Sequence, residues 1–345
     1  MSDAHPNGGR GRRPGSMDVA RLAGVSQKTV SRVLNDEPYV REDVRLRVQA
    51  AMRELGYRRN NAARALNSGR NQRIGVVCLG TALFGPSTQL VAIERTLRST
   101  GYSLSIANTL EGDSGGVAGA VERLLEQGVD GIILSEPIDE GDDQPIDVDL
   151  PVLSFGQFPG LTAQPALYTG GDNTGAGRLV TEHLLGLGHR TVWHVAGPQR
   201  WWAAQQRLDG WRQALAAAGA PEPPVLEGDW LPASGYEAGL RLAADDEVTA
   251  VFVANDDMAI GVLRALAEAG RSVPGEVSVV GFDDIPSAAY LSPPLTTVSQ
   301  DFDAHVARGI ANLVTEIESP TGDHSLVPEP PPLRMIIRHS TAPAS

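Results

Sequence analysis

The sequence between residues 16 and 35 reads SMDVARLAGVSQKTVSRVLN and determines the fold of the N-terminal region. Two short helical patterns flank a Gly-Val-Ser turn. Ser16 is expected to cap the first helix, and Asp18 lies in that helix's positively polarised first turn. Gly24 stands where helices end in a left-handed residue, and Ser26 can cap the second helix. The pattern predicts a helix-turn-helix.

The second predicted helix has two different faces. Its apolar side chains recur at i, i+3 and i+4. With those of the first helix and the turn, they are expected to form a small core of Val19, Ala20, Leu22, Ala23, Val25, Val30, Val33 and Leu34. The other face carries Gln27, Lys28, Ser31 and Arg32, which can bond to base edges or phosphates in the major groove of DNA. The alternative is a charged face that contacts only solvent, but the turn and both caps favour DNA binding.

A third helix is expected where Val44, Val48, Ala51 and Leu55 share one face, and Gly56 would end it. Residues 60–66 read NNAARAL and can form only a short helix. Such a helix is unstable in isolation, because nucleation is unfavourable and little propagation follows. We expect this segment to be disordered in the free protein and helical when docked. A plain linker is the alternative interpretation.

Charge is distributed unevenly along the chain. Residues 1–70 carry 14 Lys and Arg against 7 Asp and Glu, a charge of +7, whereas the rest carries 15 against 35, a charge of −20. A basic module joined to an acidic body is expected when only one part meets phosphate. Residues 1–15 are rich in Gly, Pro, Asn and Arg, which predicts a disordered basic tail.

The sequence carries no sign of export or of membrane insertion. It has neither a run of about 18 apolar residues nor a charged-then-apolar leader. The one cysteine, Cys78, lies in an apolar run and is expected to pack as a small buried side chain. These features predict a cytoplasmic protein without membrane contact.

The remaining chain alternates short apolar runs with helical patterns, as in parallel α/β folds. The first series has strands at 74–79, 102–107, 129–134 and 150–155, the last closing the series, with helices near 88–100 and 115–127. The second has strands at 191–196, 250–254 and 277–281, with helices near 174–187, 203–218 and 257–269. The length exceeds one comfortable core and predicts two lobes, each with a doubly wound parallel sheet.

Polar and aromatic side chains cluster near the ends of the later strands. Asn255 follows the strand at 250–254, Asp283 follows the strand at 277–281, and Arg207 and Trp230 lie on the segments before them. Open parallel sheets bind ligands at the carboxyl ends of their strands. Amide, carboxylate and guanidinium groups can bond neighbouring hydroxyls, and an indole covers the apolar face of a pyranose. The set favours a neutral polyol, and structural hydrogen bonding or core packing is the alternative for each residue.

Three motifs in the N-terminal region, at 18–20, 23–26 and 29–33, resemble the DNA-binding signature of the LacI family of bacterial transcriptional regulators. Residues 55–57 and 60–66 resemble that family's hinge, and the likeness extends to about Thr341. It implies that the hinge helices of two subunits lie in the minor groove, with Leu66 wedged between base pairs. The predicted DNA contacts are Ser16, Ser26, Gln27, Lys28, Thr29, Ser31, Arg32, Asn35, Asn60, Ala63 and Leu66.

The motifs VANDDMA at 253–259, GFDD at 281–284 and QDF at 300–302 resemble the inducer-cleft motifs of the same family. The resemblance implies a periplasmic-binding-protein-like body of type I, with two lobes joined by three crossovers. The predicted organisation is a tail at 1–15, a helix-turn-helix domain at 16–58, a hinge at 59–72, and a body at 73–341. Its first lobe would comprise 73–171 and 302–331, and its second 172–301 and 332–341.

The resemblance also implies which residues bind the effector. Arg207, Asn255 and Asp283 would hold sugar hydroxyls. Residues 79–87 and 133–139 resemble galactoside-responsive family members, which favours a β-galactoside or a related β-linked disaccharide. Two departures, Gly156 in place of an acidic sugar contact and Trp201-Trp202 in place of smaller residues, suit a longer or different glycoside. The predicted effector contacts are Leu83, Pro86, Trp201, Arg207, Trp230, Asn255, Asp283, Gln300 and Phe302.

These features predict a repressor of carbohydrate-utilisation genes that a sugar releases from a pseudopalindromic operator. A homodimer would place two recognition helices one DNA turn apart. A dimer rather than a tetramer is expected, because no heptad pattern follows Thr341. A regulator of the corepressor type with a non-sugar effector is one alternative, and a sugar-binding protein without a DNA role is another.

An enzymatic function is the remaining alternative. The sequence has no Gly-x-Ser-x-Gly, Walker A or His-Glu-x-x-His motif. His183, His189 and His194 lack partners at metal-ligand spacing. Asp256 and Asp257 could suggest glycosidase carboxylates, but neighbours at a helix start are better explained as a cap and a ligand contact. We predict no catalytic activity, no cofactor and no metal.

Overall fold

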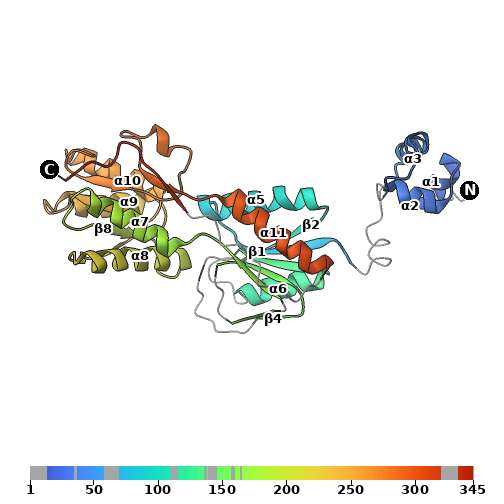
Figure 1. Cartoon of the computed structure of the whole chain (residues 1–345), viewed down its shortest axis with the longest axis horizontal. Coiled ribbons are helices and arrows are strands. Elements are labelled where there is room, and N and C mark those ends of the chain that lie inside the picture. Colours follow the sequence, from blue (N-terminus) through green and yellow to red (C-terminus); the bar gives the residue numbers. More distant parts are fainter. Residues whose placement is uncertain are drawn as a thin grey trace, which may run out of the picture. The chain divides into compact units, whose positions relative to one another are not determined.

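The computed structural model describes residues 14–34, 37–57, 70–109, 116–135, 138, 146–156, 160–163, 165–319 and 333–344 of the 345-residue chain. The chain divides into two compact units, residues 1–71 and 72–345 (Figure 1). The smaller unit is helical, and the larger one is an α/β body. None of the helices in these described ranges is both long and apolar enough to cross a lipid bilayer.

In the described part of the N-terminal unit, the helices α1 (Ser16–Ala23), α2 (Gln27–Leu34) and α3 (Glu42–Leu55) pack around a small apolar core. One valine from each helix, Val19, Val30 and Val48, is fully buried at the centre. Gly24 ends α1 with φ of 65°, and the Ser26 hydroxyl accepts from the backbone N–H of Thr29 at 3.1 Å. The helix-turn-helix prediction is confirmed, including the cap of its second helix.

Two details of the N-terminal unit differ from the prediction. Ser16 is the first helical residue rather than the cap, because Gly15 takes the N-cap position and donates its backbone N–H to the Asp18 carboxylate at 2.9 Å. Leu22 is 46% exposed and does not join the core, since it lies on the outer face of α1. Both expectations are therefore wrong.

The first lobe of the larger unit is built on a five-stranded parallel sheet in the order β2-β1-β3-β5-β7. Its elements are β1 (Arg73–Leu79), α5 (Phe84–Thr100), β2 (Ser103–Thr109), α6 (Gly116–Glu126), β3 (Gly131–Ser135), β5 (Val152–Phe155), β7 (Ala166–Thr169) and α11 (Phe302–Glu318). Two short strands, β4 (Ile146–Val148) and β6 (Leu161–Ala163), pair in parallel beside it.

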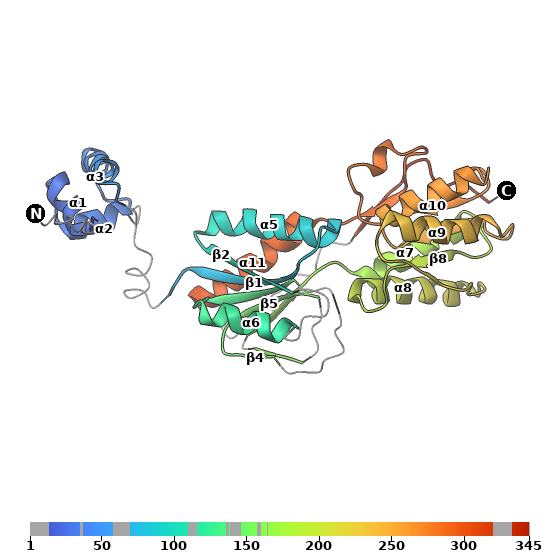
Figure 2. The same ribbon diagram turned by 180° about the vertical axis from the view of Figure 1, so that it is seen from behind.

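Helices cover both faces of this sheet because successive residues of a strand point to opposite sides. Ile74 and Val76 of β1 pack with α5 and α11, whereas Val77 packs with α6. Figure 2 shows α5 and α11 on one side of the strands and α6 on the other. Cys78 is buried as predicted, and its thiol donates to the Asn108 side-chain oxygen at 3.3 Å.

The second lobe has a four-stranded parallel sheet in the order β11-β10-β8-β9. Its elements are α7 (Asn173–Gly186), β8 (Trp193–Ala196), α8 (Trp202–Ala218), β9 (Leu226–Glu227), α9 (Pro232–Ala243), β10 (Ala250–Val253), α10 (Asp256–Glu268), β11 (Ser278–Val280) and the 3₁₀ turn η1 (Ala288–Tyr290). Phe252 faces α7 and α8, while Val251 and Val253 face α9 and α10. This is the doubly wound arrangement that the sequence predicts.

The chain passes between the lobes at three places. It leaves the first lobe after β7 and returns to it with α11, which packs on α5, β5 and β7. It enters the second lobe again at β13 (Arg334–Ile336), which pairs antiparallel with β12 (Thr297–Ser299). The predicted fold class, a helix-turn-helix domain followed by a two-lobed parallel α/β body, is confirmed.

Several elements escape the sequence pattern: the strands β4, β6, β7, β9, β12 and β13 and the helices α9 and α11. The strand at 150–155 does not close the first series, because β7 pairs with β5 as a fifth strand. The helix α9 has glycines where a helical pattern shows large apolar residues. Gly235 and Gly239 lie against the backbone and side chains of α10, which leaves no room for a larger residue.

Candidate functional site

The first candidate site is the exposed face of α2 in the N-terminal unit. Gln27, Lys28, Ser31 and Arg32 are exposed, and Val30 and Val33 on the opposite face are buried. Gln27 donates to the Ser16 hydroxyl at 2.9 Å, which ties the start of α2 to the start of α1. The hydroxyls of Ser26 and Thr29, 2.9 Å apart, form a further hydrogen bond at the turn between α1 and α2. The face thus presents several donors from one helix, as readout in a DNA groove requires.

Four predicted DNA contacts lie outside the described residues: Asn35, Asn60, Ala63 and Leu66. The role of Leu66 as a wedge in the minor groove therefore stays a prediction. Arg32 is described, and its guanidinium lies 3.4 Å from the Glu37 carboxylate in an exposed ion pair. Such a pair is weak in water, so Arg32 is free to exchange Glu37 for a phosphate or a guanine.

The second candidate site is a cavity of about 420 Å³ in the larger unit, lined by both lobes. Its size is in the range of roughly 300–1,000 Å³ that is usual for small-molecule pockets. The structure brings all nine predicted effector contacts to this cavity: Leu83, Pro86, Trp201, Arg207, Trp230, Asn255, Asp283, Gln300 and Phe302. Their role in ligand binding stays a prediction.

Arg207 is held rigidly by α8 at the cavity wall. Its Nε donates to the Asn173 side-chain oxygen at 3.0 Å, and its Nη1 donates to the backbone oxygen of Ala254. The guanidinium carbon lies 3.6 Å from the centre of the Phe282 ring. Burial lowers the pKa of Arg207 to about 10, so the side chain is still charged at neutral pH. Its remaining N–H groups have no acceptor among the described residues and are available to a ligand.

Asp283 is the acidic partner in the cavity. Its carboxylate accepts from Gln300 Nε2 at 2.6 Å and lies 3.8 Å from Arg207 Nη2, too far for a direct hydrogen bond. Burial raises the pKa of Asp283 to about 6 despite the nearby guanidinium. Asp283 also has a φ of 109° in the region that favours glycine. Strained backbone of this kind is typical of functional sites.

Asn255 combines a structural role with a place in the cavity. It is the N-cap of α10, where its side-chain oxygen accepts from the backbone N–H of Met258 at 2.9 Å. Its amide nitrogen donates to the backbone oxygen of Trp230 at 3.0 Å. A side-chain amide has two N–H donors and an oxygen with two lone pairs, so one donor and one acceptor site are left for a ligand.

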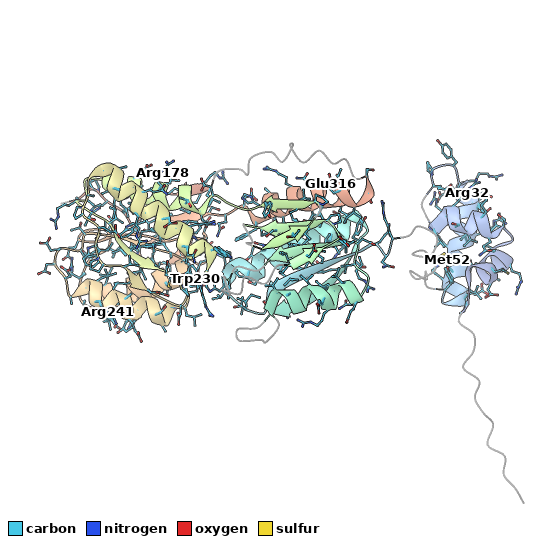
Figure 3. The ribbon with its side chains drawn as sticks, turned by 90° about the horizontal axis from the view of Figure 1, so that it is seen from below. Arg32, Met52, Arg178, Trp230, Arg241 and Glu316 are labelled. Carbon is cyan, nitrogen blue, oxygen red and sulfur yellow. The ribbon has the colours of Figure 1, made fainter. Side chains whose placement is uncertain are left out.

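Aromatic side chains form much of the remaining wall. The Trp230 indole packs flat against Gly197, where any Cβ would overlap its ring. It meets Trp201 edge-to-face, with ring centres 5.5 Å apart. Figure 3 shows Trp230 on the side of the second lobe that meets the first lobe. Trp230 has φ of 75° and a buried Nε1 without a partner in the described structure, so the residue combines strain with an unused donor.

The sequence analysis missed several residues of the cavity. Ser135, Phe155 and Thr169 lie at the carboxyl ends of β3, β5 and β7. The strand-end rule would have found Ser135 and Phe155, but not Thr169, because the sequence did not predict β7. Asn173 holds Arg207, and His305 lies one helical turn beyond Phe302, so it shares the face of α11 that reaches the cavity. The sequence could have indicated His305 by its i+3 spacing from Phe302.

The carboxylate pair considered for glycoside hydrolysis does not line the cavity. Asp256 is fully buried and accepts from the Thr297 hydroxyl at 2.7 Å and from the backbone N–H of Ile285 at 2.9 Å. Burial raises its pKa to about 8. Asp256 therefore joins α10 to β12 and the chain after β11. No group of three or more His, Cys, Asp and Glu in the described part of the chain could hold a metal ion.

Comparison with known proteins identifies the family. Residues 17–60 match the model of bacterial regulatory proteins of the lacI family, and residues 181–341 match a periplasmic binding protein-like domain. The chain is 36% identical to the lactose operon repressor of Escherichia coli K12 over 83% of this chain and 79% of that protein. This chain belongs to the lacI family of bacterial regulatory proteins. The resemblance seen in the sequence is confirmed.

Other lacI-family proteins are similarly close. Identity is 34% to the ribose operon repressor of Escherichia coli K12, over 88% of this chain and 93% of that protein. It is 35% to the regulator CelR of Thermobifida fusca, over 89% of this chain and 92% of that protein.

Solved structures of the family share the fold. The lac repressor dimer bound to operator and the anti-inducer ONPF covers 96% of this chain and 100% of its own, with a TM-score of 0.82 and 31% identity. A complex of CelR with cellobiose covers 95% of this chain and 100% of its own, with a TM-score of 0.66 and 31% identity. Of these relatives, the lac repressor has been solved on its operator and CelR has been solved with cellobiose.

Proposed function

We propose that this protein is a sequence-specific DNA-binding repressor that a sugar releases from its operator. The sugar, for which a β-linked disaccharide is the best candidate, would occupy the cavity between the two lobes. The protein would act as a homodimer in the cytoplasm and control genes of carbohydrate use. The observation that carries the proposal is the cavity itself, where Arg207, Asn255 and Asp283 keep hydrogen-bonding capacity that structural contacts do not use.

The chemistry of the cavity favours a sugar over other effectors. Arg207 supplies donors, the Asp283 carboxylate supplies acceptors, and Asn255 supplies both, which suits adjacent hydroxyl groups. The indole of Trp230 offers an apolar face of the kind that covers a pyranose ring. The solved complex of CelR with cellobiose supports the same class of ligand. The indoles of Trp201 and Trp202 enlarge the aromatic wall and suit a ligand of two rings.

Release would follow from a difference in affinity. A ligand that touches both lobes favours one angle between them, and it shifts the equilibrium only by binding that state more tightly. Each tenfold loss of operator affinity requires about 1.4 kcal/mol of coupling between the two sites.

The proposal is tested in two steps with the full chain. Duplexes that the protein enriches from a random pool should share a pseudopalindromic sequence. Gel-shift titrations on that duplex with lactose, cellobiose and their constituent monosaccharides should then show release by a disaccharide. Tighter DNA binding with sugar would reverse the proposed sign and indicate a corepressor. Turnover of the glycosides would show an enzyme instead.

An Arg32→Ala variant is expected to bind the enriched duplex about tenfold to a hundredfold more weakly. The reason is the loss of one base or phosphate contact from the exposed face of α2, which is worth about 1–3 kcal/mol at a base. Arg53→Ala is the matched control, because Arg53 is also exposed in this unit but lies on α3. Equal losses in both variants, measured by gel shift at one salt concentration, would rule out a specific role for the α2 face.

Sugar affinity is expected to rise about tenfold between pH 5 and pH 7. Hydroxyl donors favour the ionised form of Asp283, whose pKa burial raises to about 6 in the empty cavity. Binding therefore lowers this pKa, and affinity increases as the free carboxyl loses its proton. Calorimetry across this range should show the rise, whereas Asp283→Asn should bind more weakly with a flat profile. Stronger binding of the wild type at acid pH would contradict the role of the carboxylate.

A further inference from the structure

A histidine in the cavity wall makes no hydrogen bond through either ring nitrogen among the described residues. His305 lies on α11 and lines the cavity from the first lobe. It is 5% exposed, and neither ring nitrogen has a hydrogen-bond partner among the described residues. Burial lowers its pKa, so the ring is neutral at pH 7 and carries one donor and one acceptor. Two unpaired buried nitrogens carry a desolvation cost that nothing in the described structure offsets.

The packing of α11 keeps this imidazole at the wall. Gly309, one turn further along, lies so close to the sheet that a Cβ would be 2.9 Å from Leu153 and 3.0 Å from Thr169. One turn back, the Phe302 ring packs edge-to-face on Phe84 with centres 6.5 Å apart. These contacts fix α11 on both sides of His305 and hold the residue at the cavity wall.

Two other polar side chains on this wall, Gln89 and Ser135, are bonded to each other, and Tyr168 and Thr169 add hydroxyl groups at the end of β7. Gln89 Nε2 donates to the Ser135 hydroxyl at 2.7 Å. The side chains of Leu83, Phe84 and Phe155, which also line this wall, offer no hydrogen bonds. His305 is thus an unused donor and acceptor beside a largely apolar part of the cavity.

We propose that His305 determines specificity by hydrogen-bonding to a polar group of the effector. It would select ligands that carry hydroxyls at the first-lobe end over ligands with an apolar group there. The inference rests on the proposed function, in which Arg207, Asn255 and Asp283 hold the other end of the ligand from the second lobe. A ligand bonded to both Arg207 and His305 spans the lobes, which is the requirement for changing their angle.

Two pairs of ligands test the selection by calorimetry on the full chain: lactose against phenyl β-galactoside, and cellobiose against phenyl β-glucoside. In the pair that binds, the wild type should prefer the disaccharide at least tenfold. His305→Leu should abolish that preference by weakening disaccharide binding about tenfold, with phenyl glycoside binding kept or improved. His305→Gln, which retains a donor and an acceptor, should restore part of it. An unchanged preference in His305→Leu would overturn the proposal.

Stability without ligand gives a second readout that does not depend on the sugar. His305→Leu should raise the Tm of the free protein, because it replaces two unpaired nitrogens by carbon at similar size. His194→Leu is the control, since its Nδ1 bonds to the backbone oxygen of Phe252 at 2.9 Å and its loss should lower the Tm. If no glycoside binds the wild type but His305→Leu has a higher Tm, the sugar assignment of the proposed function is wrong. The higher Tm would then still support His305 as a contact to a polar effector of another class. A lower Tm for His305→Leu would show a structural role and overturn the inference.

Discussion

An Arg207→Met variant is expected to stay on its operator at sugar concentrations that release the wild type. The substitution removes the buried donors that face the cavity, and charge-assisted hydrogen bonds are worth about 1.5–3 kcal/mol each. Two such bonds correspond to a loss of sugar affinity of roughly a hundredfold or more. Operator affinity without sugar should not change, because Arg207 belongs to the larger unit and α2 to the smaller. Calorimetry with the releasing sugar and gel shifts with and without it measure both quantities.

The same substitution should affect folding less than the burial of Arg207 suggests. Removing one partner of a buried ion pair usually costs about 3–5 kcal/mol. Here the carboxylate lies 3.8 Å away and has a pKa of about 6, so it can take up a proton once the guanidinium is gone. Arg212→Met is the matched control on α8, because Arg212 pairs with Glu222 at the surface. A normal sugar response in Arg207→Met would exclude Arg207 from the effector site.

The free energy of unfolding of a Gly177→Ala variant is expected to be about 2–3 kcal/mol lower than that of the wild type. A Cβ at Gly177 would overlap the backbone oxygen of Arg207, at the crossing of α7 and α8. Backbone atoms cannot move aside as a side-chain tip can, so the helices must separate, and overpacking of this kind costs about 1–3 kcal/mol. Sugar affinity should fall as well, because the residue displaced is Arg207. Urea denaturation and calorimetry measure the two effects.

Gly186→Ala provides the control in the same helix. Gly186 lies at the exposed end of α7, and a Cβ there meets no atom within 4 Å. The intrinsic preference of a helix for alanine over glycine, up to about 1 kcal/mol, then acts alone and should stabilise the protein slightly. Equal effects of the two substitutions would show that propensity, and not the helix crossing, governs Gly177.

The N-terminal unit could be predicted almost completely, because its determinants are local. A glycine with positive φ, a serine cap and apolar residues at i, i+3 and i+4 lie within 20 residues of one another. The cap of α1 was predicted one residue late, because Asp18 reaches back to the N–H of Gly15 and makes Gly15 the cap. An error of one residue at a helix end changes neither the fold nor the exposed face of α2.

In the body, sequence patterns located β1, β2, β3, β5, β8, β10 and β11 but missed the short strands β4, β6, β7, β9, β12 and β13 and the helices α9 and α11. The strand β7 has four residues, of which Leu167 alone is buried, so its pairing with β5 leaves little trace in the sequence. In the sequence, the glycines of α9 argue against a helix because glycine has a low helix propensity. Only the close approach of α10, where Gly261 lies against the backbone of α9, shows that they are packing residues.

The sequence by itself determined the family, the helix-turn-helix and the residue types that gather near the strand ends. Only the tertiary structure decided which of them share a cavity and how much bonding capacity each keeps. Asn255 is partly used as a cap, Asp283 is held at positive φ, and His305 is left without a partner. These properties arise from contacts between residues far apart in the chain, such as Arg207 with Ala254 and Gln300 with Asp283. A local pattern records the type of a side chain, whereas its pKa, its strain and its free donors depend on the neighbours that folding brings to it.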